Sequence, residues 1–380
     1  MLFLGRKFGK KNVIKVDPLA YNLGLIGESG IGKTTLAKEV CESLVGENGY
    51  IIANVGMEDG IDAIAGAVYE DIPDWDVFEE FCDDIIENKT TDYKDLKVVI
   101  WDTIDELIRI SEPESIRLYN NDQIGKKNAK HAKTIKQAWG GYGNGEKVTI
   151  DLIMEKMWEL KRIGVAMFLI GHTKKRTMSD PISEIEYDIL TTNMQMNYFN
   201  ALKTKLHVLG VASIDRQIVT EKTTKKDFDG NIKTKGNITD QTRKITFRDD
   251  NFSVDSKSRF SEIVDTIPLD ADEFINAVEN AIKIEHDKQT GNKPMADVKK
   301  EQADEKEKEI NKNAAKKKVE LDKKKTEAIV IKLTDYIKAN KSTPEVLKPL
   351  IEKSKKLGYV NPTQVTDLKD AQTLYKMIEG

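Results

Sequence analysis

The sequence is poor in cysteine and has no long apolar run. Cys41 and Cys82 are the two cysteines among 380 residues, and both lie in partly apolar stretches with helical spacing. They lack the spacing of a metal site or of a disulfide framework, so we expect buried free thiols in a reducing cytoplasm. Apolar runs such as 165–170 are far shorter than the ~20 residues that cross a bilayer, and the first residues lack the apolar segment of a secretory signal. We therefore expect no disulfide scaffold, zinc module or membrane span.

Charge of one sign does not dominate either. The formal net charge is -4, with 33% charged and 39% hydrophobic residues. This balance excludes a uniformly basic coat for nucleic acid but leaves local basic patches open. The length exceeds that of one domain of common size, so two domains, or a core with appendages, are expected.

A phosphate-binding pattern, G-x-x-x-x-G-K-[ST], is present near the N-terminus. The preceding residues 21–26 have the composition of a buried strand, and 36–45 space their apolar residues as a helix does. In this setting backbone N–H groups and the helix N-terminus hold phosphate, Lys33 reaches the β- and γ-phosphates, and Thr34 binds Mg²⁺. The alternative is a glycine-rich turn with an accidental Lys-Thr. The predicted nucleotide-binding residues are Gly27, Glu28, Ser29, Gly30, Ile31, Gly32, Lys33, Thr34 and Thr35.

Two further apolar segments end near a carboxylate. Residues 50–55 precede Glu58, and 97–101 precede Asp102. In open α/β sheets, ligands bind at the carboxyl ends of the strands, where such side chains gather. Asp102 has the place of a Walker B aspartate, which would hold Mg²⁺ together with Thr34, although an apolar run ending in Asp also arises by chance.

The fourth predicted strand, 164–170, leads to His172. A histidine at this edge could sense the γ-phosphate, or it could be an ordinary structural histidine. Strands that alternate with helices predict an α/β fold with a mostly parallel central sheet.

Residues 112–147 show no stable apolar period and are longer than an ordinary connection. Basic and aromatic residues recur in this segment, and the run 139–145 is rich in glycine. Basic side chains follow a phosphate backbone, and aromatic rings stack on unpaired bases. The segment therefore favours a nucleic acid with unpaired bases over the alternative of a solvated loop. The predicted contacts are Lys126, Lys127, Lys130, Lys133, Lys136, Trp139 and Tyr142.

A second loop is expected at 173–205, and it begins with the basic residues Lys174, Lys175 and Arg176. The segments 205–213 and 216–220 have strand character, and 243–248 is expected to pair with the latter as a protruding hairpin. Lys257 could be an exposed charge or could reach the triphosphate of a neighbouring subunit.

The ends of the chain differ from its centre. Residues 1–19 start basic and predict an arm or a solvated tail. Residues 269–284 predict an amphipathic helix that closes a core domain spanning 1–284. The following 285–325 is rich in charge and has no Phe, Trp or Tyr, which predicts a flexible or helical linker. Helical periodicity returns over 326–380, where a small helical unit for a partner or DNA is expected.

With these motifs in order, residues 15–285 resemble the RecA-like P-loop ATPases, and more closely the phage nucleotide-binding proteins of the Sak type, which are RecA-related single-strand annealing proteins. In RecA-like proteins a glutamate just after the second strand polarises the attacking water, and Glu58 matches it. Asp102 matches the Walker B aspartate. His172 stands where RecA has the glutamine that senses the γ-phosphate. The loops 112–147 and 173–205 would correspond to the DNA loops, which implies Lys174, Lys175 and Arg176 as further DNA contacts.

The resemblance implies a magnesium-dependent ATPase that binds single-stranded DNA and promotes annealing or recombination. It also implies a homo-oligomer, either filament or ring, and the cytoplasm of a bacterial host for a phage protein. The terminal helices could bind a single-strand-binding or replication protein. The bacterial RecA oligomerisation helix has no counterpart here, and the first loop is longer and more basic. Two alternatives stay open: a RecA-core helicase or helicase loader, and a nucleotide-gated adaptor without significant turnover.

Overall fold

A computed structural model describes residues 12–56, 59–127, 129–179, 186–226, 232–249, 254–290 and 294–379. The chain divides into two compact units. The first comprises 1–82 with 95–307, and the second comprises 83–94 with 308–380. Within the described parts, no helix is both long and apolar enough to span a bilayer.

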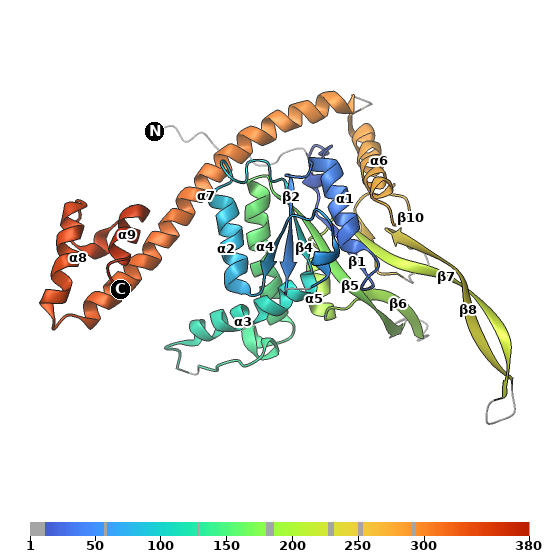
Figure 1. The fold of residues 1–380 in the computed structure, drawn as a ribbon, viewed down its shortest axis with the longest axis horizontal. Coiled ribbons are helices and arrows are strands. Elements are labelled where there is room, and N and C mark those ends of the chain that lie inside the picture. Colours follow the sequence, from blue (N-terminus) through green and yellow to red (C-terminus); the bar gives the residue numbers. More distant parts are fainter. Residues whose placement is uncertain are drawn as a thin grey trace. The chain divides into compact units, whose positions relative to one another are not determined.

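The first unit is built on a twisted sheet whose central strands are parallel (Figure 1). Strand β1 lies between β5 and β7, and β5 separates it from β4, β2 and β3. All these neighbours pair in parallel, which confirms the predicted α/β class. The strands are β1 (Leu23–Gly27), β2 (Tyr50–Val55), β3 (Tyr69–Ile72), β4 (Val98–Asp102), β5 (Ala166–Ser179) and β7 (Val208–Lys226).

Antiparallel strands extend the sheet beyond β7. β8 (Ile232–Thr246) pairs with β7 as a long ribbon, and β10 (Thr266–Pro268) pairs with β8. β9 (Lys257–Ser258) pairs with the start of β7, and β6 (Glu186–Thr192) with the second half of β5. The predicted hairpin is therefore present, but its register differs. Arg243 pairs with Ile214 rather than within 216–220, because the two predicted strand segments form one continuous strand.

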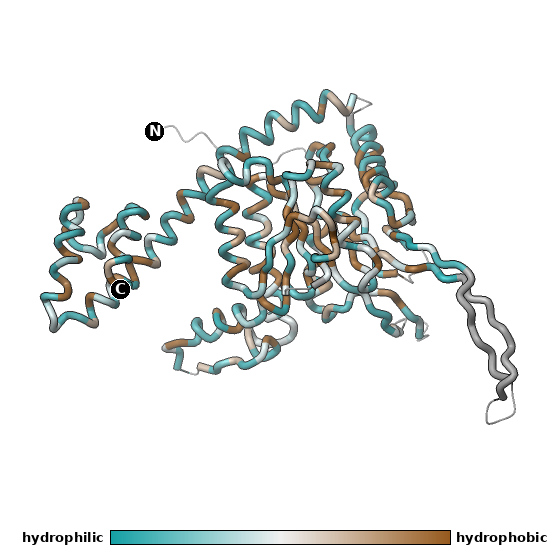
Figure 2. The backbone as a smooth tube through the Cα atoms, in the orientation of Figure 1, coloured by the Kyte–Doolittle hydropathy of each residue, from teal (hydrophilic) through white to brown (hydrophobic). Residues whose placement is uncertain are grey.

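Helices cover both faces of the sheet. α1 (Lys33–Val45) and α6 (Ala271–Thr290) share one core with β1, β5 and β8, in which Phe168, Phe247 and Phe274 pack together. α3 (Ile104–Gln123) and α4 (Asn144–Arg162) belong to the first unit and contact each other and β5. The central strands are the most apolar part of the first unit (Figure 2). Short helices complete it: η1 (Pro18–Ala20), η2 (Asp59–Ala63), η3 (Ile135–Gly140) and α5 (Met196–Lys203), and α2 (Trp75–Glu87) begins in it.

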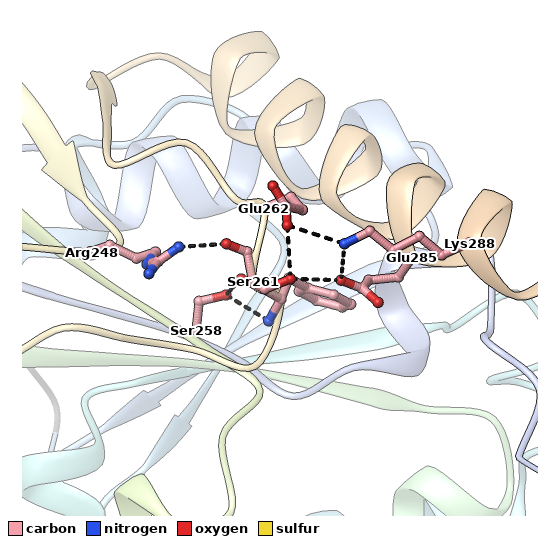
Figure 3. A network of polar contacts seen from close by, with 7 residues as sticks. Arg248, Ser258, Ser261, Glu262, Glu285 and Lys288 are labelled. Atoms are coloured by element: carbon pink, nitrogen blue, oxygen red, sulfur yellow. Dashed lines mark hydrogen bonds and ion pairs between the residues drawn. The ribbon is translucent and has the colours of Figure 1, made fainter.

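A polar network fixes α6 to the segment that follows β9 (Figure 3). Ser261 Oγ donates to Glu285 Oε1 at 2.9 Å, and Lys288 Nζ lies 3.1 Å from Glu262 Oε1. Arg248 donates to the carbonyl of Ser261. These contacts are exposed, so their role is to set the position of α6 more than to add stability.

The two predicted DNA loops are largely regular structure. α3 continues to Gln123, so it covers the first third of 112–147, and α4 begins at Asn144. Helical periodicity was not visible because Ser111 and Ser115 are buried on the inner face of α3 and Pro113 lies within it. The second predicted loop is wrong in its structure too, since it contains the β5–β6 hairpin and α5.

The second unit is helical. It contains most of α7 (Met295–Ala339) together with α8 (Pro344–Lys356), η4 (Pro362–Gln364) and α9 (Leu368–Tyr375). Its core comprises Leu333, Leu350, Val365, Ala371 and Leu374. The charged segment 285–325 is helical wherever it is described, apart from Pro294.

Candidate nucleotide site

The phosphate-binding pattern forms a compact loop between β1 and α1. Gly27 ends β1, Lys33 begins α1, and Gly32 between them has φ +105°, a value that favours glycine. Lys33 is only 6% exposed, and its Nζ donates to the carbonyls of Gly27 (3.2 Å) and Glu28 (2.9 Å). The ammonium therefore lies inside the turn of the loop, where the pattern predicts it.

The remaining loop residues are either buried in the core or exposed to solvent. Ile31 is buried in the core shared by β1 and α1, whereas Ser29, Gly30 and Thr35 are exposed. A side chain at Gly27 would not fit, because its Cβ would lie 2.9 Å from the Cβ of Ala212 on β7 and 3.0 Å from the carbonyl oxygen of Ala212. The start of the loop is thus packed directly on β7.

Asp102 reaches the loop from β4. Its Oδ2 accepts a hydrogen bond from Thr34 Oγ1 at 2.5 Å. Burial raises the pKa of Asp102, and the Thr34 hydrogen bond and the Lys33 charge act against that rise. No group of three or more His, Cys, Asp or Glu residues suited to a metal occurs in the part of the chain described. Thr34 and Asp102 instead supply two oxygens of the kind that Mg²⁺ accepts, leaving other positions to water or phosphate.

His172 lies between the two motifs because β5 lies between β1 and β4. In the parallel register His172 pairs with Gly27, and Ile170 pairs with Asp102. The backbone N–H of His172 donates to Asp105 Oδ2 at 2.8 Å, and the Nδ1 of His172 is 3.6 Å from the same oxygen. Phosphate loop, Asp102 and His172 are therefore brought together. Glu58 lies outside the described residues.

Asp105 was missed by the sequence interpretation. It stands in the first turn of α3, whose N-cap Thr103 accepts a hydrogen bond from the N–H of Glu106 at 3.4 Å. The pattern Thr-x-x-Glu directly after Asp102 is a capping-box signal, and it would have placed Asp105 at the same edge as the motif. Oδ1 of Asp105 is buried and has no hydrogen-bond partner among the described residues.

The first set of predicted DNA contacts is mostly exposed. Tyr142 is fully open at 105% exposure, on a backbone with φ 53°. Trp139 is instead partly buried: its ring packs edge-on against Tyr119, and its Nε1 donates to the carbonyl of Ser115. The lysines of this set, all exposed, are Lys126, Lys127, Lys130, Lys133 and Lys136.

The second set lies on the β5–β6 hairpin. Lys174 is exposed, and Lys175 is exposed beside Asp188 with 2.6 Å between Nζ and Oδ2. Arg176 is turned inward, where its guanidinium donates to the carbonyls of Thr192 and Met194. These contacts give Arg176 a role in joining the hairpin to the segment before α5.

Lys257 lies at the opposite edge of the sheet from the phosphate loop. β9 pairs with the first residues of β7, where Lys257 stands opposite Leu209, whereas Gly27 pairs three residues further on, with Ala212. The Nζ of Lys257 donates to the carbonyl of Lys203 at the end of α5. Within one chain it therefore does not join the nucleotide site.

Comparison with known proteins identifies the core. A family profile for the AAA domain matches residues 20–260, which is well over half of the 380-residue chain. No curated protein matches the sequence significantly. The match confirms the nucleotide-binding part of the expectation, and the geometry of Lys33, Thr34 and Asp102 agrees with it. The chain belongs to the AAA domain family, and its matched region is an AAA-type P-loop ATPase-like domain.

Proposed function

We propose that the protein is a magnesium-dependent ATPase that binds single-stranded DNA and promotes the annealing of complementary strands in recombination. The observation that carries the proposal is the 2.5 Å contact between Thr34 and Asp102 beside the buried Lys33, with His172 on the strand between them. The family supports nucleotide binding. Turnover and the DNA reaction are the steps proposed here.

In this proposal each residue has a defined task. Lys33 and the backbone of the loop bind the triphosphate, and Thr34 and Asp102 hold Mg²⁺, which when bound neutralises developing phosphate charge. Glu58 orients the attacking water, as the resemblance to RecA-like proteins implies. Because little covalent chemistry falls to the protein in phosphoryl transfer, positioning and charge supply most of the acceleration.

Two observations support DNA as the partner. The lysines that follow α3 and the ring of Tyr142 are all exposed in the segment between α3 and α4, which thus carries both phosphate-binding charge and a stacking surface. From His172 onward, strand β5 continues into the β5–β6 hairpin, which carries Lys174. Loss of the γ-phosphate at His172 would therefore act directly on a DNA-contacting hairpin. We also propose a homo-oligomer, a filament or a ring, in the cytoplasm of a bacterial host, with the terminal helices binding a single-strand-binding or replication protein.

The central test is ATP turnover with and without single-stranded DNA. Lys33→Ala should abolish nucleotide binding or turnover, since it removes the buried ammonium. Lys38→Ala is the matched control: it lies on α1 one turn beyond the loop and pairs with Glu42 at 2.7 Å. Equal turnover in Lys33→Ala and wild type would refute the assignment of the site.

The DNA part needs its own measurement. Affinity for an oligonucleotide should fall steeply with salt, and Tyr142→Ala should weaken it about tenfold, the scale of one lost stacked base. Tyr69→Ala is the control, because Tyr69 is also exposed but lies on edge strand β3. Annealing of complementary strands separates this proposal from a helicase, which would unwind a tailed duplex with directionality. Salt-independent binding would contradict the DNA assignment.

A further inference from the structure

Two arginines at the base of the β7–β8 ribbon contact the phosphate loop. Arg243 on β8 donates from Nη1 to the carbonyl of Ile31 at 3.2 Å, although 212 residues separate the two. Arg216 on β7 lies with Nη2 3.7 Å from Glu28 Oε2. No phosphate-loop motif predicts either residue. Both loop residues stand within the segment that binds phosphate.

The register of the ribbon explains why these two side chains act together. Ile214 pairs with Arg243, and Arg216 pairs with Gln241. Because side chains alternate between the faces of a strand, Arg216 and Arg243 lie on the same face as diagonal neighbours. Lys244 lies on the other face, where its Nζ is 3.1 Å from Asp215 Oδ2. The face turned to the loop thus carries the two arginines.

Other contacts fix this junction. The carbonyl of Arg243 accepts a hydrogen bond from the N–H of Leu269 at 3.0 Å. A Cβ placed on Gly32 would lie 3.6 Å from Leu269 Cδ2 and 3.8 Å from Arg243 Nη1. Arg243 is therefore held at the point of the loop where Gly32 and Lys33 turn into α1.

We propose that Arg243 is a positioning residue of the nucleotide site and that it couples the triphosphate to the β7–β8 ribbon, with the Arg216–Glu28 pair as a second connection. This inference rests on the proposed function of the loop. A guanidinium has five N–H donors in a planar fork, so a group that donates to the carbonyl of Ile31 can also donate to a phosphate oxygen. The ribbon, which runs beyond the sheet edge (Figure 1), then responds to what the loop holds.

The first measurement is the affinity for a fluorescent ATP analogue. Arg243→Ala should bind about tenfold more weakly, the scale of one lost charge-assisted hydrogen bond. Arg243→Lys should recover part of the loss, because it keeps the charge but not the fork. Lys244→Ala removes a charge from the neighbouring position on the other face and should bind within about twofold of wild type. Equal affinity in Arg243→Ala and Lys244→Ala would overturn the inference.

The second measurement reports the coupling rather than the affinity. Trypsin cleaves after lysines of the ribbon, such as Lys222 and Lys235. Saturating ATP analogue should slow cleavage there in wild type and Lys244→Ala, and should have no effect on it in the double variant Arg216→Ala, Arg243→Ala. Equal protection in the double variant would exclude coupling. If the double variant does not fold, the same comparison is made with Arg243→Lys, which should show reduced protection. Wild-type protein that binds no nucleotide would refute the proposed function itself, whereas binding without these differences refutes this inference alone.

Discussion

The carboxyl edge of the central sheet, where its parallel strands end, presents Lys33, Asp102 and His172. The amino edge, where these strands begin, presents Lys257 and Arg259. Both edges gather cations around a strand end. At the carboxyl edge, the Lys33 ammonium lies within the turn of the phosphate loop. Asp102 next to it accepts a hydrogen bond from the Thr34 hydroxyl, a group of the kind that also binds cations.

At the amino edge the donors are occupied by the backbone. Lys257 donates to the carbonyl of Lys203, and Arg259 donates to those of Thr204 (2.8 Å) and Leu206 (3.3 Å). These carbonyls end α5 and the turn after it, a place where cations are favourable. In both places the donors meet backbone carbonyls, so what distinguishes the carboxyl edge is the phosphate loop around Lys33 and the Thr34–Asp102 pair that accompanies it.

The largest effect should come from Asp102 at the carboxyl edge. Asp102→Asn keeps the shape and an acceptor for Thr34 but removes the charge that would hold the metal. We expect ATP turnover to fall by about 10²–10³-fold, the range for loss of one preorganised electrostatic group. Asp255→Asn is the control, because the ion pair of Asp255 with Lys203 and its 2.8 Å hydrogen bond from Thr191 are structural. A similar loss of turnover in both variants would refute the special role of Asp102 at the carboxyl edge.

The next effect concerns Asp105, which fixes His172 through its backbone N–H and lies near the imidazole. Asp105→Asn should leave basal turnover within a few fold and reduce the stimulation of turnover by DNA about tenfold, a typical coupling between two sites. His172→Ala should have the same effect, because it removes the imidazole whose Nδ1 lies 3.6 Å from Asp105 Oδ2. If basal and DNA-stimulated rates fall by the same factor, the pair does not connect the two sites.

A stability effect without a catalytic one is expected from Arg259. Arg259→Ala removes two hydrogen bonds, one of them exposed to solvent, so the free energy of unfolding should fall by about 1–1.5 kcal/mol, measured by urea denaturation. Lys257→Ala should behave alike, with turnover unchanged. A different outcome would sharpen the comparison: if Lys257→Ala abolishes turnover and mixing with Lys33→Ala restores it, Lys257 acts on the site of a neighbouring subunit.

Local signals predicted the site, whereas contacts distant in sequence were not predictable. The phosphate loop, β4 with Asp102 and β5 with His172 each follow from a run of apolar residues and the polar residue that ends it. The sequence did not predict the full length of α3, because buried serines on its inner face interrupt the apolar periodicity of a helix. It did not predict β5 beyond Thr173 either, because this part forms an exposed hairpin, which has no buried face to produce alternating apolar and polar residues. Arg243 was unpredictable since its partner, Ile31, is fixed only by the register of β7 and β8.

The smallest effect is a pH dependence at the amino edge. The Nδ1 of His207 accepts a hydrogen bond from the N–H of Asn22 at 3.0 Å, so the folded chain needs the neutral ring. Burial first, and then the charges of Lys161, Arg259 and Lys257, lower the pKa of His207 to about 4. The unfolded chain would protonate this histidine near pH 6.5. Its contribution to stability is therefore complete above pH 6.5 and is lost as the pH falls toward 4.

His207→Asn tests this sign, because an amide oxygen can accept from Asn22 but does not titrate. Between pH 7 and pH 5 the free energy of unfolding of wild type should fall by about 1 kcal/mol more than that of the variant, a figure reduced for solvent screening of this partly exposed ring. ATP turnover measured at both pH values should not separate the two proteins, since His207 lies at the edge opposite the phosphate loop. If the stability of wild type and of His207→Asn changed in parallel with pH, protonation of the His207 ring would not destabilise the fold. If the two proteins instead differed in turnover, the amino edge would affect the nucleotide site.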